Sequence, residues 1–411
     1  MNQHRSHNSS FQHQQQPCKK WRDDHEQNDR EHSKSSKPNH QQHRSSGPPS
    51  PQTLSTSSEL YERDFPLYKQ PVEVGCFSLD SERRFFNDSR QMRYYVEPEK
   101  SPYFNLRQGY RDRYVKRDES VKEKLDHILR WILANRPKLT RRSDASSSSR
   151  GFDVDFVTWR GHLTKLLTTP YETQEGWLLA VTNFKGTLYV SEVETDAARR
   201  DRENRTGRHR EMMYWGYKFE QYMCADKIDG YPDSSGTVNT NEAFCTVVQT
   251  RLSDHRLLFS GEVDCRDKDS GAPAPPACYV ELKTSAEIRT PKQRRNFHRF
   301  KLLKWWAQSF LPGVPRVVAG FRDDRGVVVS VETFRISEIS RLIKAEDNCW
   351  RPTVCMNFCS DFLSFVKRVA TQDHPRVVYL LGWNPGCDVT YSVHRDTSYS
   401  FLPDWYVKEM S

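Results

Sequence analysis

The sequence lacks several features that would assign a function class at once. None of its apolar runs approaches the length of a membrane-spanning helix, and its start has no apolar stretch typical of a signal peptide. It has ten cysteines but no C-x₂-C pair, and it has no P-loop, Rossmann glycine set, zinc motif or G-x-S-x-G elbow. These absences argue against a membrane partner, a zinc module, the common nucleotide-binding loops and a serine-hydrolase site.

Aliphatic residues are scarce in the first sixty residues of the 411-residue chain. That segment is rich in Gln, His, Ser, Asn and Pro, a composition that cannot bury enough apolar surface to fold. We therefore predict a disordered low-complexity tail over residues 1–60 and a single folded domain over residues 61–411. The net charge of +9 favours polyanionic partners.

The remainder of the chain mixes helical and strand patterns without regular βαβ units. Apolar periodicity predicts helices over residues 119–135, 154–167, 216–223, 337–344 and 356–370. Alternation and turn signals predict hairpins over 177–194 and 317–331, two C-terminal strands, and further strands over 244–252, 257–265 and 278–284. The charged stretch 197–211 is interpreted as a surface loop or helix end. This mixture predicts an α+β or mixed α/β fold.

Two acidic tripeptides stand out in predicted strands that lie close together in the sequence. They are Glu262-Val263-Asp264 and Glu281-Leu282-Lys283. Side chains at i and i+2 of a strand share a face, so Glu262 would project with Asp264, and Glu281 with Lys283. If the strands are neighbours, three carboxylates and one ammonium converge. Such a cluster needs a cation, and beside a lysine it suits Mg²⁺ or Mn²⁺ and phosphodiester hydrolysis.

One acidic tripeptide alone is more often the solvated face of a half-buried sheet. The second tripeptide, in which Lys283 replaces the last carboxylate, favours a functional site over a solvated sheet face. An E-x-K strand that follows an acidic strand resembles the arrangement of the PD-(D/E)xK nucleases. In those enzymes the acids hold metal, and the lysine positions a water or steadies developing negative charge.

A basic stretch interleaved with aromatic residues follows Lys283. Its basic residues would contact phosphates, and its aromatic rings would stack on bases, if the stretch lies beside a nucleic-acid groove. Trp305 and Trp306 are instead expected to pack a helix against the sheet. The basic residues are Lys292, Arg294, Arg295, Arg299, Lys301 and Lys304.

Five segments, in this order, resemble the decapping exoribonuclease family and its fungal relatives. The resemblance extends over about residues 65–407. The segments are WRGHLTKLL at 159–167, GYKFEQYMCAD at 216–226, FSGEVDC at 259–265, YVELKTS at 279–285 and KLLKWWAQSFLPGVP at 301–315.

The resemblance implies two mixed sheets with flanking helices and an active site with two divalent ions, Mg²⁺ or Mn²⁺. The implied metal ligands are Glu220, Glu262, Asp264, Glu281 and the main-chain carbonyl of Leu282. The implied catalytic residues are Glu262, Asp264, Glu281, Lys283 and Gln308. The implied substrate contacts are Arg83, Glu123, Trp159, Arg160, Gly161, Cys245, Glu262, Lys283 and Gln308.

The resemblance also implies a hydrolase that removes incomplete or unusual RNA 5′ caps and degrades RNA from 5′ to 3′. The expected substrates are the unmethylated cap, the NAD cap and the 5′-triphosphate. The implied partners are RNA 5′ ends and a nuclear 5′→3′ exoribonuclease, with the nucleus as the main location and the cytoplasm as a second one. A catalytically inactive RNA 5′-end binding protein is the alternative, although the complete acidic set and Lys283 argue against it. A DNA nuclease on the same scaffold is a third reading.

Overall fold

The structure is a computed structural model that describes residues 52–99, 102–139, 152–271, 274–344, 346 and 349–411. All elements below belong to the compact unit Thr53–Ser411. The predicted tail lies outside the described residues as far as residue 51. Ordered structure starts before the expected boundary at residue 61, because the Leu54 N–H donates to the Val389 carbonyl at 3.0 Å and η1 spans Ser58–Tyr61. The extent of the single domain stays a prediction.

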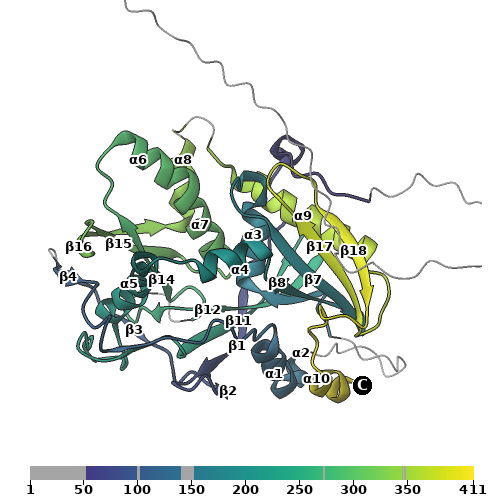
Figure 1. The fold of residues 1–411 in the computed structure, drawn as a ribbon, viewed down its shortest axis with the longest axis horizontal. Helices are drawn as coiled ribbons and strands as arrows, with labels where there is room; N and C mark the ends of the chain where they lie inside the picture. The colour runs from purple at the N-terminus through teal and green to yellow at the C-terminus, as the bar shows by residue number, and fades with distance from the viewer. Residues whose placement is uncertain (1–51, 100–101, 140–151, 272–273, 345, 347–348) are drawn as a thin grey trace, which may run out of the picture. The chain divides into compact units, whose positions relative to one another are not determined.

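Two large mixed sheets organise this unit (Figure 1). In sheet order, the nine-stranded sheet consists of β18 (Thr390–Arg395), β17 (Val377–Trp383), β7 (Trp177–Phe184), β8 (Thr187–Val193), β6 (Phe156–Trp159), β12 (His255–Glu262), β11 (Ala243–Leu252), β1 (Val72–Leu79) and β2 (Phe85–Phe86). The seven-stranded sheet consists of β4 (Phe104–Asn105), β16 (Val327–Arg335), β15 (Arg316–Arg322), β14 (Tyr279–Ala286), β13 (Cys265–Arg266), β3 (Tyr94–Tyr95) and β9 (Cys224–Ala225). A small parallel pair joins β10 (Val238–Asn239) to β5 (Tyr114–Val115).

Helices flank both sheets, as predicted. They are α1 (Asp126–Ala134), α2 (Arg136–Leu139), α3 (Arg160–Thr168), η2 (Thr169–Tyr171), α4 (Asp196–Glu203), α5 (Gly207–Met223), α6 (Pro291–Asn296), η3 (Phe297–Lys301, a π turn), α7 (Leu302–Phe310), α8 (Ile336–Lys344), α9 (Pro352–Val369) and α10 (Asp404–Met410). Within the described part of the chain, no helix has the length and apolar character needed to cross a membrane.

Apolar side chains alternate between the two faces of each central strand, as period-two geometry requires. In β7, Leu179 and Val181 enter the core shared with α3, α7 and α9, whereas Ala180 enters the core under α1 and α10. Figure 1 shows α3 and α9 on one face of the nine-stranded sheet and α1 and α10 on the other. In the seven-stranded sheet, Val280 and Leu282 of β14 pack against α5 in a third core.

Three local predictions differ from the structure. The helix predicted over 154–167 is a strand followed by a helix, because the β-branched and aromatic residues of β6 pair in parallel with both β12 and β8. The helix predicted over 119–135 begins only at Asp126, since Lys124 has a positive φ of 47°. The charged stretch 197–211 lies at the surface, as predicted, but it contains most of α4 and the first turn of α5, which Thr195 and Thr206 cap. The predicted hairpins and the mixed two-sheet fold are confirmed.

Candidate active site

The chain crosses from one large sheet to the other at Val263 and Asp264. β12 ends at Glu262, and β13 then pairs with β14 through Cys265 and Val280. The backbone N–H of Leu282 donates to Asp264 Oδ2 at 2.6 Å, which ties the crossing to β14. The acidic tripeptides therefore meet, although β12 and β14 are not neighbouring strands. Strand β12 ends at Glu262, so Asp264 lies just beyond it, but the two acids project together into one cavity and Val263 is buried, as predicted.

The E-x-K tripeptide has the predicted geometry. Leu282 enters the core under α5, while Glu281 and Lys283 lie on the opposite face of β14. Lys283 Nζ lies 2.7 Å from Glu281 Oε1. Glu281 is only 1% exposed, so its charge needs partners within the protein.

Arg160, at the N-terminus of α3, is the second partner of Glu281. Its Nη1 lies 3.2 Å from Glu281 Oε2, and the residue is 6% exposed. Gly261 of β12 makes room for this side chain, since a Cβ at that position would lie 2.9 Å from Arg160 Nε and 3.0 Å from its Cβ. The structure therefore holds a guanidinium and an ammonium on the two oxygens of one buried carboxylate.

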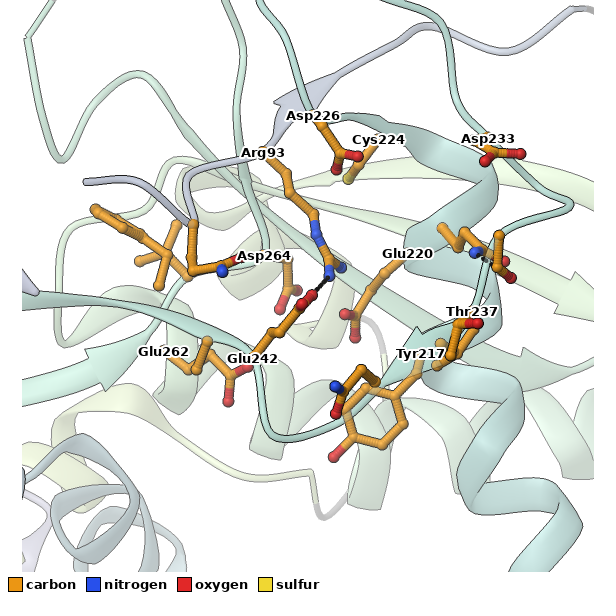
Figure 2. Close-up of a pocket in the computed structure, with 18 residues that line it drawn as sticks. Arg93, Tyr217, Glu220, Cys224, Asp226, Asp233, Thr237, Glu242, Glu262 and Asp264 are labelled. Carbon is orange, nitrogen blue, oxygen red and sulfur yellow. Dashed lines mark hydrogen bonds and ion pairs between the residues drawn. The ribbon is translucent and has the colours of Figure 1, made fainter. Parts of the chain in front are cut away.

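A cavity of about 280 Å³ lies beside the crossing. Figure 2 shows Glu220 of α5, Glu262 and Asp264 facing this space together. It also contains Glu242, which pairs with Arg93 at 3.5 Å. Sequence reasoning missed Arg93 and Glu242 because both lie in irregular segments outside any motif.

The acidic groups perturb one another strongly. Burial and the charges of Asp264 and Glu262 raise the pKa of Glu220 well above its ordinary value, although the positive charges of Arg93 and Lys283 lower it in part. Burial and the charge of Glu281 raise the pKa of Asp264 to about 7, although Lys283 and the hydrogen bond from the Leu282 N–H lower it in part. Burial would also raise the pKa of Glu281, but Arg160 and Lys283 hold it below its ordinary value. Glu220 and Asp264 are therefore the carboxyls that resist ionising unless a cation compensates their charge.

This donor set fits a hard divalent cation, because carboxylate oxygens and a main-chain carbonyl are the ligands such ions prefer. Among the described residues, no three His, Cys, Asp or Glu side chains stand close enough to enclose a metal ion as they are placed. The physical reason is that Glu281 turns its oxygens to Arg160 and Lys283, and Asp264 accepts from the backbone. A cation would compete with those partners for the same oxygens.

A second cavity, of about 600 Å³, opens on the other side of Glu262. Its lining includes seven of the residues predicted to contact substrate: Arg83, Glu123, Trp159, Arg160, Gly161, Cys245 and Glu262. Glu262 lines both cavities and is itself exposed. The structure thus places the predicted substrate contacts directly beside the acidic cluster.

Arg83 and Glu123 form a two-pronged ion pair in this second cavity. The distances are 2.8 Å from Nε to Oε1 and 2.9 Å from Nη2 to Oε2. Burial alone would raise the pKa of Glu123, but His127, whose Nε2 lies 3.3 Å from Oε1, and the hydrogen bonds from Arg83 hold it far below its ordinary value. The Trp159 indole N–H donates to the Lys124 carbonyl at 2.7 Å, which fixes its ring at the cavity wall.

Gln308 lines neither cavity, as is also true of Glu281, Leu282 and Lys283 on strand β14. Gln308 lies in α7 and is half buried. The helix packs against α3, which begins with Arg160. Its predicted role near the reacting phosphate stays a prediction.

The fold, the buried E-x-K strand and the adjacent acids together define a PD-(D/E)XK-type nuclease. Residues 69–407 match the family described as RAI1 like PD-(D/E)XK nuclease, and the chain belongs to this family of hydrolases. It is 55% identical over 364 residues to the Decapping and exoribonuclease protein of Xenopus laevis, covering 87% of this chain and 90% of that protein. It is 55% identical over 363 residues to the Homo sapiens protein of the same name, with the same coverage. The Decapping nuclease RAI1 of Neurospora crassa is 33% identical over 322 residues, covering 75% of this chain and 74% of that protein.

Solved structures share the architecture. Rai1 of S. pombe in complex with 3′-FADP has a TM-score of 0.66 at 25% identity, covering 82% of this chain and 98% of that one. Rai1 of Scheffersomyces stipitis, in complex with (3′-NADP)⁺ and calcium, has a TM-score of 0.74 at 24% identity, covering 87% and 98%. The likeness to the Scheffersomyces stipitis structure, at 24% identity, shows that the two chains have the same fold.

Proposed function

We propose that this chain is a divalent-metal-dependent hydrolase of RNA 5′ ends, which removes incomplete or unusual caps and then degrades the RNA from 5′ to 3′. The names of the relatives at 55% identity, which describe decapping and exoribonuclease activity, support the reaction class. The single observation that carries the proposal is the buried Glu281, shared by Arg160 and Lys283, beside Asp264 and a cavity lined by basic and aromatic side chains.

The cavity around Arg83 and Trp159 would hold the first nucleotide or cap. An aromatic wall suits stacking, and guanidinium groups suit charge-assisted hydrogen bonds to phosphate. The phosphodiester that follows would then lie at Glu262, which lines both cavities. In this arrangement Arg160 binds the phosphate, while Lys283 orients the water or stabilises the developing negative charge. Gln308 is proposed to orient the water as well.

Mg²⁺ or Mn²⁺ would be held by Glu220, Glu262, Asp264, Glu281 and the Leu282 carbonyl, and we propose two ions per site. The ions would supply neutralisation of the phosphate, activation of water and stabilisation of the leaving 3′-oxygen. The raised pKa values of Glu220 and Asp264 support this assignment, because they mark buried carboxyls that ionise readily only when a counter-ion is present.

One hydrolytic step would serve several substrates if the enzyme cuts the first accessible phosphodiester. The released group would then be a cap dinucleotide, intact NAD or a mononucleotide, depending on which 5′ end fills the cavity. The S. pombe relative, whose structure contains 3′-FADP, supports a site that accepts a dinucleotide. The unmethylated cap, the NAD cap and the 5′-triphosphate are the proposed ends.

The place of action is proposed to be the nucleus, with the cytoplasm as a second location and a nuclear 5′→3′ exoribonuclease as a partner. The family and the net charge of +9 support this. Imaging of the tagged full-length chain, followed by affinity purification from nuclear extract, tests both statements.

The reaction itself is tested with end-labelled RNAs bearing each of four 5′ ends, namely triphosphate, unmethylated cap, NAD cap and monophosphate. We expect metal-dependent products that disappear in the Glu262→Ala/Asp264→Ala variant. Tight RNA binding without product from any substrate would instead support an inactive RNA 5′-end binding protein. Equal cleavage of matched DNA would support a DNA nuclease.

A further inference from the structure

The helical stretch after β14 carries positive charge that the proposed active site does not use. Lys292 and Arg295 of α6 and Arg299 of η3 follow one another at spacings of three and four residues, so they form one stripe on the helix surface. All three are exposed, and none takes part in an ion pair among the described residues. We refer to these three residues as the basic stripe.

The first residue of the basic stripe, Lys292, lies at the end of its helix where the dipole disfavours positive charge. Helix α6 begins with a complete capping box, in which the side chains of Thr290 and Gln293 each accept a backbone N–H of the other residue. The first turn contains Lys292 and no acidic residue, although the helix dipole favours negative charge at this end. An unpaired cation at a helix N-terminus reduces stability, which favours a role in binding over a role in folding for Lys292, whereas Arg295 lies in the last turn of α6.

Core packing of Phe297 fixes the orientation of the helical segment that carries the basic stripe. Phe297 is buried and lies 5.1 to 5.7 Å, between ring centroids, from Trp305, Phe321 and Phe334. The π turn of η3 lets Phe297 enter this core while Phe300 stays 43% exposed. An exposed aromatic ring beside unpaired cations is the combination that binds single-stranded nucleic acid.

A continuous path leads from the acidic cluster to the basic stripe. β14 has β15 on one edge along residues 281–286, but β13 covers its other edge only as far as Val280. Because the Leu282 N–H points to the open edge, where it binds Asp264, the backbone groups of Thr284 and Ala286 point there too. At ~3.3 Å per residue, the open edge from Leu282 to Ala286 is ~13 Å long.

The path continues at the end of β14. Lys301 Nζ donates to Ser285 Oγ at 3.1 Å, so this lysine lies over the last part of the strand. Figure 1 shows the chain leaving β14 and reaching α6 beyond the sheet, at the upper left. The path from the acidic cluster therefore passes first along the backbone N–H groups of β14. It then reaches Lys301 and finally the basic stripe.

We propose that the RNA strand 3′ of the cut phosphodiester runs along the open edge of β14 and is held by the basic stripe. This subsite rests on the proposed function, since it assumes that the cut occurs at the acidic cluster. It would hold the backbone of single-stranded RNA without reading its sequence, because the contacts are made by cations and one exposed ring. Longer RNAs would gain affinity that a trinucleotide cannot reach.

The test compares a trinucleotide with a strand several times longer that has the same 5′ end. In the variant Lys292→Gln/Arg295→Gln/Arg299→Gln we expect the KM of the long strand to rise about tenfold. The slope of log KM against log salt concentration should become less steep by about 2, because three phosphate contacts are lost. The kcat and KM of the trinucleotide should not change. The matched control is Lys138→Gln/Lys185→Gln/Lys408→Gln, three exposed lysines on α2, the β7–β8 turn and α10.

An unchanged KM and salt slope for the long strand would overturn the proposal and leave the basic stripe to an acidic protein partner. Photo-crosslinking is an independent measurement on the unaltered protein. Thiouridine placed downstream of the cut should crosslink to residues 291–301, and crosslinks only elsewhere would contradict the subsite. Failure to cleave the trinucleotide would be a different result, because it would contradict the proposed function itself.

Discussion

Arg160 and Glu281 join the two large sheets through a buried ion pair of 3.2 Å. Arg160 begins the helix that follows β6 in one sheet, and Glu281 lies on β14 in the other. Lys283 completes the arrangement at 2.7 Å. The proposed active site therefore depends on the same contact that fixes the relative position of these two strands.

Substitution of Arg160 by lysine tests whether the reaction needs the planar shape of the guanidinium or only its positive charge. Lysine keeps the positive charge but lacks the planar fork that can bind Glu281 and a phosphate at once. We expect Arg160→Lys to fold and to lose at least tenfold in kcat/KM on capped RNA. Steady-state kinetics and circular dichroism check this outcome. A variant with unaltered kinetics would show that the guanidinium has no part in the reaction.

Gly261→Ala should disturb Arg160 without changing any charge. The new Cβ would lie 2.9 to 3.0 Å from Arg160 atoms, and such overpacking costs about 1–3 kcal/mol. Urea denaturation should show this loss, and RNA cleavage should slow because the guanidinium is displaced. Gly216→Ala is the control, since nothing lies within 4 Å of a Cβ there and alanine favours a helix. Equal stability of the two variants would contradict the packing argument.

The Arg83–Glu123 pair predicts a particular acid sensitivity. A carboxylate with a depressed pKa stabilises the fold above the ordinary glutamate value of about 4.3, and this contribution is lost as the pH falls toward the folded-state value. Glu123→Gln should therefore cost about 1–3 kcal/mol near neutral pH, and the difference from the unaltered protein should shrink below about pH 4. Urea titrations across a pH series measure it. A difference independent of pH would mean that the ion pair does not stabilise the fold.

Metal binding should release protons near neutral pH. In the absence of metal, the raised pKa of Asp264, about 7, keeps part of this carboxyl protonated, and a cation needs the carboxylate. Affinity for Mn²⁺ should therefore fall as the pH is lowered through about 7, by up to about tenfold per unit for one released proton. Calorimetric titration in buffers of different ionisation enthalpy counts the protons. In Asp264→Asn the pH dependence should weaken, and an unchanged dependence would assign it to another group.

The part of the site that the sequence predicts is the part that follows from local periodicity. Glu281 and Lys283 share a face because residues two apart in a strand always do. The seven predicted substrate contacts in the second cavity follow from family motifs, and the structure brings them together without testing their roles. Strand β6 was missed because apolar residues over 154–167 also fit a helical period, although its β-branched and aromatic residues favour a strand.

Other features required the tertiary structure. Glu262 and Asp264 meet Glu281 through a crossing between sheets, and no periodicity in the sequence predicts that Cys265 pairs with Val280. The Arg93–Glu242 pair joins two loops far apart in the chain. Gly261 matters only because Arg160 lies against it. Such contacts depend on topology, which local residue patterns do not determine.

The most direct test of the account follows the oxygen atom that water donates. Capped RNA is cleaved in heavy-oxygen water with Mn²⁺, and both products are analysed by mass spectrometry. The account predicts an intact cap dinucleotide with a free 3′-hydroxyl, and a shortened RNA whose new 5′-phosphate carries the heavy oxygen. Glu281→Gln should abolish both products. Heavy oxygen in the released cap fragment, or cleavage within the cap phosphates, would contradict hydrolysis of the first phosphodiester at Glu262, Asp264 and Glu281.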